Sequence, residues 1–147
     1  MTITPKQRAS FDSKRQQVRS ELSEMAATYR THSGSVYMAV KAEILLNHLE
    51  YVGSRYTVAL SSVGNPDHGQ FCGRDNLSPT IILSADTLPE IVQCCRSYIE
   101  LYDLGGGNCP NFPVLENGKR FGTVSFNSRI WGLDGREVNP SQKEVAA

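Results

Sequence analysis

The sequence has no excess of charge of either sign, because its 147 residues include 15 Lys and Arg and 15 Asp and Glu. A neutral chain has no long-range attraction for polyanions or membrane surfaces, so binding to either needs a local patch. Long apolar runs are also missing, since no stretch approaches the roughly 18 apolar residues of a membrane span. The composition therefore excludes a general polyanion binder and a membrane protein, and it favours a single globular domain.

The N-terminal residues are polar and basic, without the apolar core of a secretion signal. Of the four cysteines, Cys94 and Cys95 are adjacent. Without a secretion signal we expect reduced thiols and a cytoplasmic protein. The cysteines do not show the paired spacing of zinc ligands, so we expect no metal site and no cofactor.

Two helices are predicted at the N-terminal end. Thr4, Pro5 and Gln7 indicate the start of the first helix, which ends within residues 31–35. Its apolar residues form a narrow stripe, suited to one partner helix and interrupted by Arg15. The stripe consists of Phe11, Val18, Leu22, Met25 and Tyr29. The second helix, residues 36–52, is apolar around most of its circumference, which predicts that it is the buried core helix.

A third helix begins after Thr87, which forms a capping box with Glu90, and it stops at Gly105. Its apolar residues make one continuous face. The glycines at 105–107 follow the C-terminal end of this helix, where the helix dipole has the wrong sign for a phosphate. We therefore expect the glycine run to be a flexible exit from the helix.

The remaining segments predict strands. Residues 55–63 alternate in hydrophobicity, and residues 79–83 are short and β-branched. Asn-Gly at 117–118 and Asp-Gly at 134–135 are strong hairpin signals, so the C-terminal part predicts an antiparallel meander. The order ααββαβββ predicts a two-layer α+β domain, with an N-terminal helical pair plus a third helix packed on a mainly antiparallel sheet. We expect residues 1–138 to form this domain and residues 139–147 to be a loose tail.

The polar loop at 64–78 is the first place to look for a site, because loops of this length in compact domains are usually functional or disordered. His68 and Cys72 lie four residues apart and are weak candidates for a base and a thiol nucleophile. Arg74 and Asp75 follow as candidate binding residues. The alternative is a turn-rich loop in which the histidine is exposed.

The C-terminal meander interleaves cations with aromatic rings. Its candidate binding residues are Lys119, Arg120, Phe121, Arg129 and Trp131. Cations on a sheet hold phosphates and exposed aromatic rings stack bases, so the pattern suits a nucleic-acid or nucleotide-binding module. The alternative is that the aromatic rings pack on the helices while the cations are solvated.

Charge is uneven along the chain, because residues 1–30 carry six basic and three acidic side chains, whereas residues 31–103 carry four and eight. The basic candidates for partner docking are Lys6, Arg8, Lys14, Arg15 and Arg19. This distribution predicts that the first helix docks on an acidic partner or on the acidic middle of a second copy. The narrow apolar stripe makes a separate prediction, an antiparallel helix pair formed either with the second helix or across a two-fold axis in a homodimer.

No segment supplies a nucleophile, a base and an oxyanion donor together, so no catalytic set is predicted. The favoured hypothesis is a non-enzymatic interaction protein that binds a macromolecular partner, most of all a protein. A small inhibitor or adaptor, such as a phage- or plasmid-encoded modulator of host machinery, fits this size. The alternatives are nucleic-acid or nucleotide binding by the meander and a small Cys/His enzyme that uses the 64–78 loop.

Overall fold

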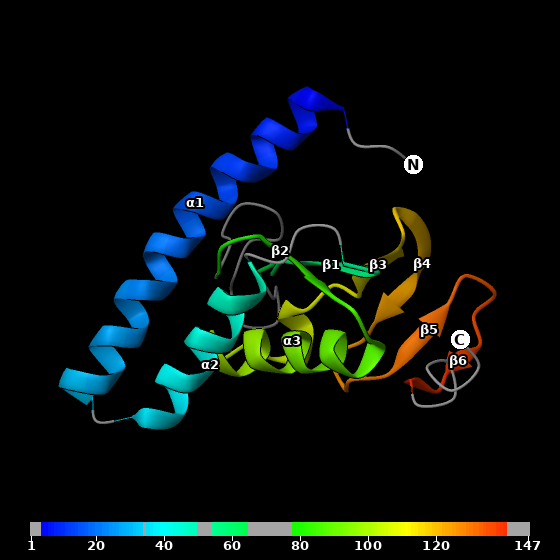
Figure 1. Ribbon diagram of the computed structural model, residues 1–147. Helices are drawn as coiled ribbons and strands as arrows, with labels where there is room; N and C mark the ends of the chain where they lie inside the picture. Colours follow the sequence, from blue (N-terminus) through cyan, green and yellow to red (C-terminus); the bar gives the residue numbers. More distant parts are fainter. Residues whose placement is uncertain (1–3, 34, 50–53, 65–77, 141–147) are drawn as a thin grey trace.

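The computed structural model describes residues 4–33, 35–49, 54–64 and 78–140. Helices occupy most of the N-terminal third, and strands dominate the C-terminal third (Figure 1). The elements in chain order are α1 (Pro5–Thr28), η1 (Tyr29–Ser33), α2 (Val36–His48), β1 (Tyr56–Leu60), β2 (Ile81–Ala85), α3 (Leu88–Leu101), η3 (Gly106–Asn108), β3 (Phe112–Glu116), β4 (Lys119–Val124), β5 (Ile130–Gly132) and β6 (Glu137–Val138).

The six strands form one antiparallel sheet in the order β2-β1-β3-β4-β5-β6. Val58 on β1 lies opposite Leu83 on β2 and opposite Val114 on β3, so these three side chains share one face. The α+β class and the succession of a helix pair, a helix and then strands are confirmed. Four strands follow α3, one more than the predicted order contains, because the last hairpin supplies two of them.

Helix α3 covers one face of the sheet (Figure 1). Tyr98 on α3 packs edge-on against Phe112 on β3, with ring centroids 6.0 Å apart, and both residues are fully buried. The strand residues that point the other way are mostly half-buried, which makes this the less covered face. They include Thr57, Ala59, Ile82, Leu115, Thr123 and Trp131.

The predicted hairpins are confirmed by backbone geometry. Asn117 and Gly118 have φ values of 50° and 81°, and these positive values are those of the tight turn that the Asn-Gly pair favours. Gly135, in the Asp-Gly pair, has φ of 80°. Local turn chemistry therefore determines the register of the meander before any packing is considered.

The predicted start of α3 is also confirmed. The Thr87 hydroxyl accepts a hydrogen bond from the Glu90 backbone N–H at 3.3 Å and donates one to the Glu90 carboxylate at 3.0 Å. The helix buries eight of its 14 residues, so α3 is the helix at the centre of the core. Burial of this extent comes from its continuous apolar face.

The prediction that the second helix is buried all round is wrong. Helix α2 leaves Val36, Tyr37 and Val40 exposed at 58%, 61% and 42%, respectively. It lies at the side of the fold beside α1 and α3, so only part of its surface meets other elements (Figure 1). Small buried residues, Ala39 and Ala42, allow that close contact.

Helix α1 packs along α2 through its C-terminal half, where Val18, Leu22 and Ala26 are buried. The apolar stripe therefore has a partner helix within the same chain, as one of the two predicted arrangements requires. The N-terminal end of α1 extends beyond the rest of the fold (Figure 1). In residues 4–10 every side chain whose exposure is described is exposed. We call this segment the projecting end of α1.

Candidate functional site

The catalytic and binding candidates of the long loop, His68, Cys72, Arg74 and Asp75, lie outside the described residues. The Cys/His enzyme therefore stays a hypothesis. The structure does describe both ends of this loop, at Gly64 and Ser78, and the residues that hold them.

A cluster of buried hydroxyl groups holds the C-terminal end of the loop. Ser78 Oγ donates to Ser62 Oγ at 2.8 Å and contacts the Tyr98 hydroxyl, which donates to the Pro79 carbonyl at 2.8 Å. Burial raises the pKa of Tyr98 to about 12, although its hydrogen bonds to the two serines act in the opposite direction. Tyr98 is therefore a neutral, structural donor at neutral pH rather than a base.

Asn108 holds the N-terminal end of the 64–78 loop. Its backbone carbonyl accepts from the Val63 N–H at 2.9 Å, and its side-chain amide donates to the Val63 carbonyl at 3.1 Å. The side-chain oxygen also accepts from the Gly105 N–H at 3.0 Å. The segment after the glycine run thus clamps the base of the loop, a role that the sequence did not reveal because its partner is 45 residues away.

The aromatic rings of the meander do not share one surface. Phe121 packs edge-on against the buried Tyr56, with ring centroids 5.9 Å apart. A register shift between Val114 and Leu115 accompanies this arrangement, because it leaves Phe121 as the extra residue of β4. Trp131 pairs with Thr123 on the less covered face of the sheet, so it is separated from Phe121.

Cations surround the meander, and Lys119, Arg120 and Arg129 are all exposed. Arg129 lies 3.8 Å from the carboxylate of Glu137, which is itself about half exposed. Arg120 lies opposite Leu115 in the register, so it is on the same face as Trp131. The structure thus brings Arg120 and Trp131 to one face and assigns Phe121 to the core.

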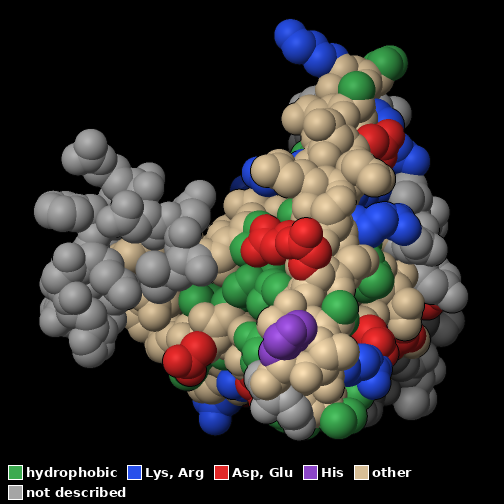
Figure 2. Space-filling model, turned by 90° about the vertical axis from the view of Figure 1, so that its left-hand side faces the viewer, with side chains coloured by type: hydrophobic (Ala, Val, Ile, Leu, Met, Phe, Trp, Pro, Cys, Tyr) green, Lys and Arg blue, Asp and Glu red, His purple; other side chains and the backbone are tan. Residues whose placement is uncertain are grey.

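The basic residues of α1 fall into two environments. Lys6 and Arg8 lie on the projecting end and are exposed, as is Lys14 farther along the helix, whereas Arg19 is half-buried. Figure 2 shows Lys and Arg side chains along this protruding part of the molecule. Only one acidic residue, Asp12, lies among the first fourteen residues, so this end of the helix is locally basic.

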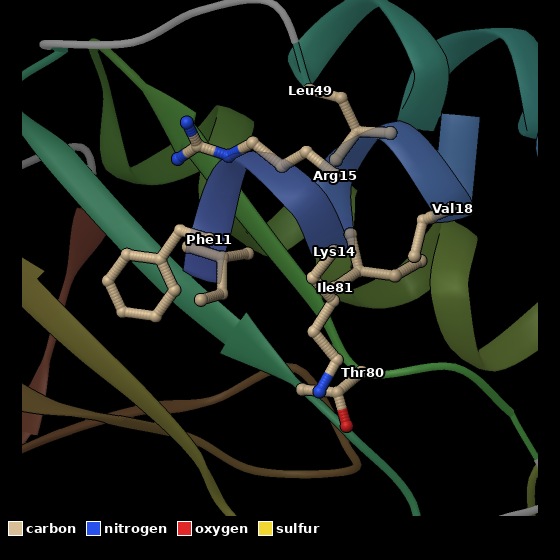
Figure 3. A pocket seen from close by; sticks show the side chains of 8 residues that line it. Phe11, Lys14, Arg15, Val18, Leu49, Thr80 and Ile81 are labelled. Carbon is tan, nitrogen blue, oxygen red and sulfur yellow. The ribbon is translucent and has the colours of Figure 1, made fainter. Parts of the chain in front are cut away.

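Arg15 is different, because only 14% of its side chain is exposed. It lies between α1 and β2 among the apolar side chains of Phe11, Leu49 and Ile81, in a pocket too small to admit a water molecule (Figure 3). Its Nε and Nη1 atoms are buried and have no hydrogen-bond partner among the residues that the structure describes. Burial, together with the nearby Arg8 charge, lowers the pKa of Arg15 despite the opposing effect of Asp12. An arginine nevertheless remains charged in proteins.

A larger hollow lies next to this pocket, with a volume of about 370 Å³. It shares Lys14, Val18 and Thr80 with the Arg15 pocket. Its other walls come from α1 and from the chain leading into β2: Gln17, Glu21, Ser78 and Pro79. We call this hollow, between α1 and the chain leading into the edge strand β2, the recess.

A polar network that the sequence did not reveal joins α2 to α3. Glu100 accepts from Lys41 Nζ at 2.6 Å and from the Tyr37 hydroxyl, and it lies 3.5 Å from Arg96 Nε. These hydrogen bonds from Lys41 and Tyr37 lower the pKa of Glu100. Arg96 also donates to the Phe126 carbonyl at 2.9 Å. Since each charge has a partner, this network ties elements together rather than forming a reactive site.

The described cysteines are not activated nucleophiles. Burial raises the pKa of Cys94 to about 12 and that of Cys109 to about 11, and it raises that of Cys95 further. Across the described parts of the chain, no three His, Cys, Asp or Glu side chains gather as metal ligands would. No helix among these same residues combines the length and apolarity needed to cross a membrane.

No family model matches the chain, and the comparisons with curated proteins and with solved structures also yield no match.

Proposed function

We propose that this protein is a non-enzymatic docking protein that binds an acidic protein partner through α1. The observation that carries the proposal is the projecting end of α1, whose described side chains are exposed although they belong to a 24-residue helix. Lys6 and Arg8 lie on this end, and Lys14 continues the basic surface toward the recess beside β2.

Packing against the rest of the fold does not explain why the projecting end of α1 is helical. A polar helix in water gains little from propensity alone, and ordering it costs conformational entropy. A partner that covers the projecting end would supply the missing contacts. Basic residues clustered at one tip also steer an acidic partner during its diffusional approach, while the neutral net charge suppresses binding elsewhere.

The experiment compares two charge-reversal variants of the full chain as baits in the organism from which the protein comes. One variant is Lys6→Glu, Arg8→Glu and Lys14→Glu. The matched control reverses three exposed cations of the meander, Lys119→Glu, Arg120→Glu and Arg129→Glu. We expect the α1 variant to lose an acidic protein that the wild type and the control both retain, and this retention to weaken as salt is raised. A partner retained equally by all three chains would contradict the proposal.

A second candidate function is the binding of single-stranded nucleic acid by the less covered face of the sheet. The specific observation is that Trp131 and the exposed Arg120 share this face. A base stacked on the indole, with cations beside it, is a common arrangement in such proteins.

Trp131 is the single tryptophan of the chain, so its fluorescence reports on this face alone. Stacking of a base on the indole quenches that fluorescence. We expect titration with oligo(dT) to quench it at low salt, and Arg120→Glu to weaken the effect. Fluorescence that does not change with oligo(dT) or with single-stranded RNA would contradict this candidate, and it would leave the docking proposal unaffected.

A further inference from the structure

The recess between α1 and the chain leading into β2 has charges of opposite sign on its α1 wall. Lys14 and Glu21 both line this hollow of about 370 Å³, and both side chains are exposed. They are nearly two helical turns apart, so they lie on the same side of α1 with their Cα atoms separated by roughly 10 Å along the helix axis. The recess therefore has a positive end toward the projecting end of α1 and a negative end toward the C-terminal half of the helix.

Both charges are accessible to another molecule. Across the described parts of the chain, neither Lys14 nor Glu21 forms an ion pair. Lys14 extends from α1 toward Thr80, which belongs to the opposite wall (Figure 3). Because the two charged side chains are exposed at a hollow that admits water, a ligand reaches them without any opening of the fold.

The rest of the lining indicates what kind of ligand fits between the two charges. Gln17 lies between Lys14 and Glu21 on α1, and its amide both donates and accepts hydrogen bonds. Thr80 on the opposite wall adds a hydroxyl group. A peptide chain suits these groups, because its backbone N–H and C=O groups also donate and accept. A wholly apolar ligand would leave them without partners.

We propose that the recess binds a segment of the partner protein that carries an acidic and a basic side chain, the acidic group at Lys14 and the basic group at Glu21. This assignment rests on the proposed docking function, in which Lys6 and Arg8 attract an acidic partner. Glu21 then determines which acidic segments fit, because it repels a segment with acidic side chains at both positions. Specificity comes from this repulsion as well as from the two attractive pairs.

The test titrates the full chain with capped peptides of equal length that differ only at two positions. A Ser-Ser spacer lies between these positions, so their Cα atoms are about 10 Å apart in an extended peptide. The two positions hold glutamate and lysine in the mixed peptide, glutamate twice in the acidic peptide, lysine twice in the basic peptide and serine twice in the neutral peptide. NMR measures each affinity and shows which backbone amides of the protein respond.

The variants reverse one charge of the recess or exchange the two. Glu21→Lys makes both ends positive, Lys14→Glu makes both ends negative, and the double variant again has one charge of each sign. Asp86→Lys is the matched control for Glu21→Lys, because it changes the net charge equally at an exposed residue that does not line the recess. Lys119→Glu is the corresponding control for Lys14→Glu.

We expect the wild type and both controls to bind the mixed peptide about three- to fivefold more tightly than the other peptides, as exposed charge pairs allow. The amides that respond should lie within residues 14–21 and 78–80. Glu21→Lys should prefer the acidic peptide, and Lys14→Glu should prefer the basic one. The double variant should recover the preference for the mixed peptide, which binds it in the reverse direction.

Several outcomes would overturn this assignment. A peptide preference that does not change in Glu21→Lys would show that Glu21 does not contact the ligand. Amide responses outside both walls, or equal or no binding of all the peptides, would remove the recess as the site. If the bait with Lys6, Arg8 and Lys14 reversed still loses its acidic partner, any of these results leaves docking through α1 intact. Tightest binding of the acidic peptide by the wild type would show that the recess selects only anions.

Discussion

Helices α3 and α1 differ in how much of their length is buried against the rest of the fold. Helix α3 buries eight of its 14 residues over the sheet. Helix α1 is longer, with 24 residues, but its buried side chains are Val18, Leu22 and Ala26 in its C-terminal half. A helix that buries a continuous face is bound to the core along its whole length, whereas a polar helix is bound only where its few apolar residues meet a neighbour.

Polar contacts strengthen the same contrast. The polar groups of α3 are satisfied at the loop base through Tyr98 and at α2 through Glu100. On α1, Lys6, Arg8 and Lys14 are exposed, and the Nε and Nη1 atoms of Arg15 are buried without hydrogen bonds among the described residues. The charged side chains of α3 thus connect it to other elements, whereas the ion pairs of Arg8 and Arg15 with Asp12, at 3.8 and 3.7 Å, stay within α1. Four predictions test this comparison.

The largest expected effect is in the core beneath α3. Ile91 is fully buried, so Ile91→Ala removes packed atoms and leaves a cavity. We expect the free energy of unfolding to fall by about 2–5 kcal/mol, measured by denaturant titration. Val92→Ala on the same helix, at a half-buried position, should cost less. Equal and small effects at both positions would show that α3 is not the central helix.

The next effect compares Tyr98 on α3 with Tyr102, the residue that follows this helix, whose rings lie 5.1 Å apart. Tyr98→Phe leaves the Ser78 and Pro79 oxygens without their donor or acceptor, and we expect a loss of about 2 kcal/mol. Tyr102 buries its hydroxyl without a hydrogen-bond partner in the described residues. Tyr102→Phe should therefore be neutral or stabilising. A larger loss for Tyr102→Phe than for Tyr98→Phe would contradict this account of the hydroxyl cluster.

A smaller effect concerns the pairing of Glu100 with Lys41 and Tyr37. Because these hydrogen bonds lower the pKa of Glu100 in the folded chain, its ionised form stabilises the fold above the unfolded value of about 4.3. That stabilisation is lost as pH falls through the lower, folded pKa. We expect Glu100→Gln to lose about 1.5 kcal/mol at neutral pH and to flatten the acid limb of the stability curve. An acid limb identical to that of the wild type would exclude Glu100 as a contributor.

The smallest effect compares the two halves of α1. Ala9 lies on the projecting end and Ala27 in the half that packs on α2, and both side chains are exposed. Glycine costs about 1 kcal/mol relative to alanine in a helix interior. Ala27→Gly should show that cost in global unfolding, whereas Ala9→Gly should leave global stability nearly unchanged and speed amide exchange only near residues 4–10. Equal losses would mean that the projecting end unfolds together with the core.

The elements with local signals were predictable. Thr87 is the N-cap of α3 and bonds to Glu90, and Asn117-Gly118 and Gly135 have the positive φ values that their turns require. These features depend on residues one to three positions apart. The α+β class followed from them, because helix and strand periodicities are local as well.

The candidate site was predictable only in part. Basic residues near the N-terminus are visible in the sequence, and Arg15 lies on the apolar stripe of the helix whereas Lys14 does not, which agrees with their different exposure. The apolar residues around α2 also predicted that it is the core helix, although three of them, Val36, Tyr37 and Val40, are exposed in the structure. Which face of a helix is covered depends on neighbours that are distant in the chain.

The sequence by itself determined the elements, their caps and turns, the zero net charge and the basic character of the first helix. The tertiary structure alone decided that α3 is the core helix, that Phe121 and Trp131 are separated, and that Asn108 holds the base of the 64–78 loop. The physical reason is the distance along the sequence between the residues that interact. Caps and turns form between residues close in the sequence, whereas burial and charge pairing depend on long-range contacts such as those between Tyr98 and Phe112 and between Lys41 and Glu100, which no local pattern encodes.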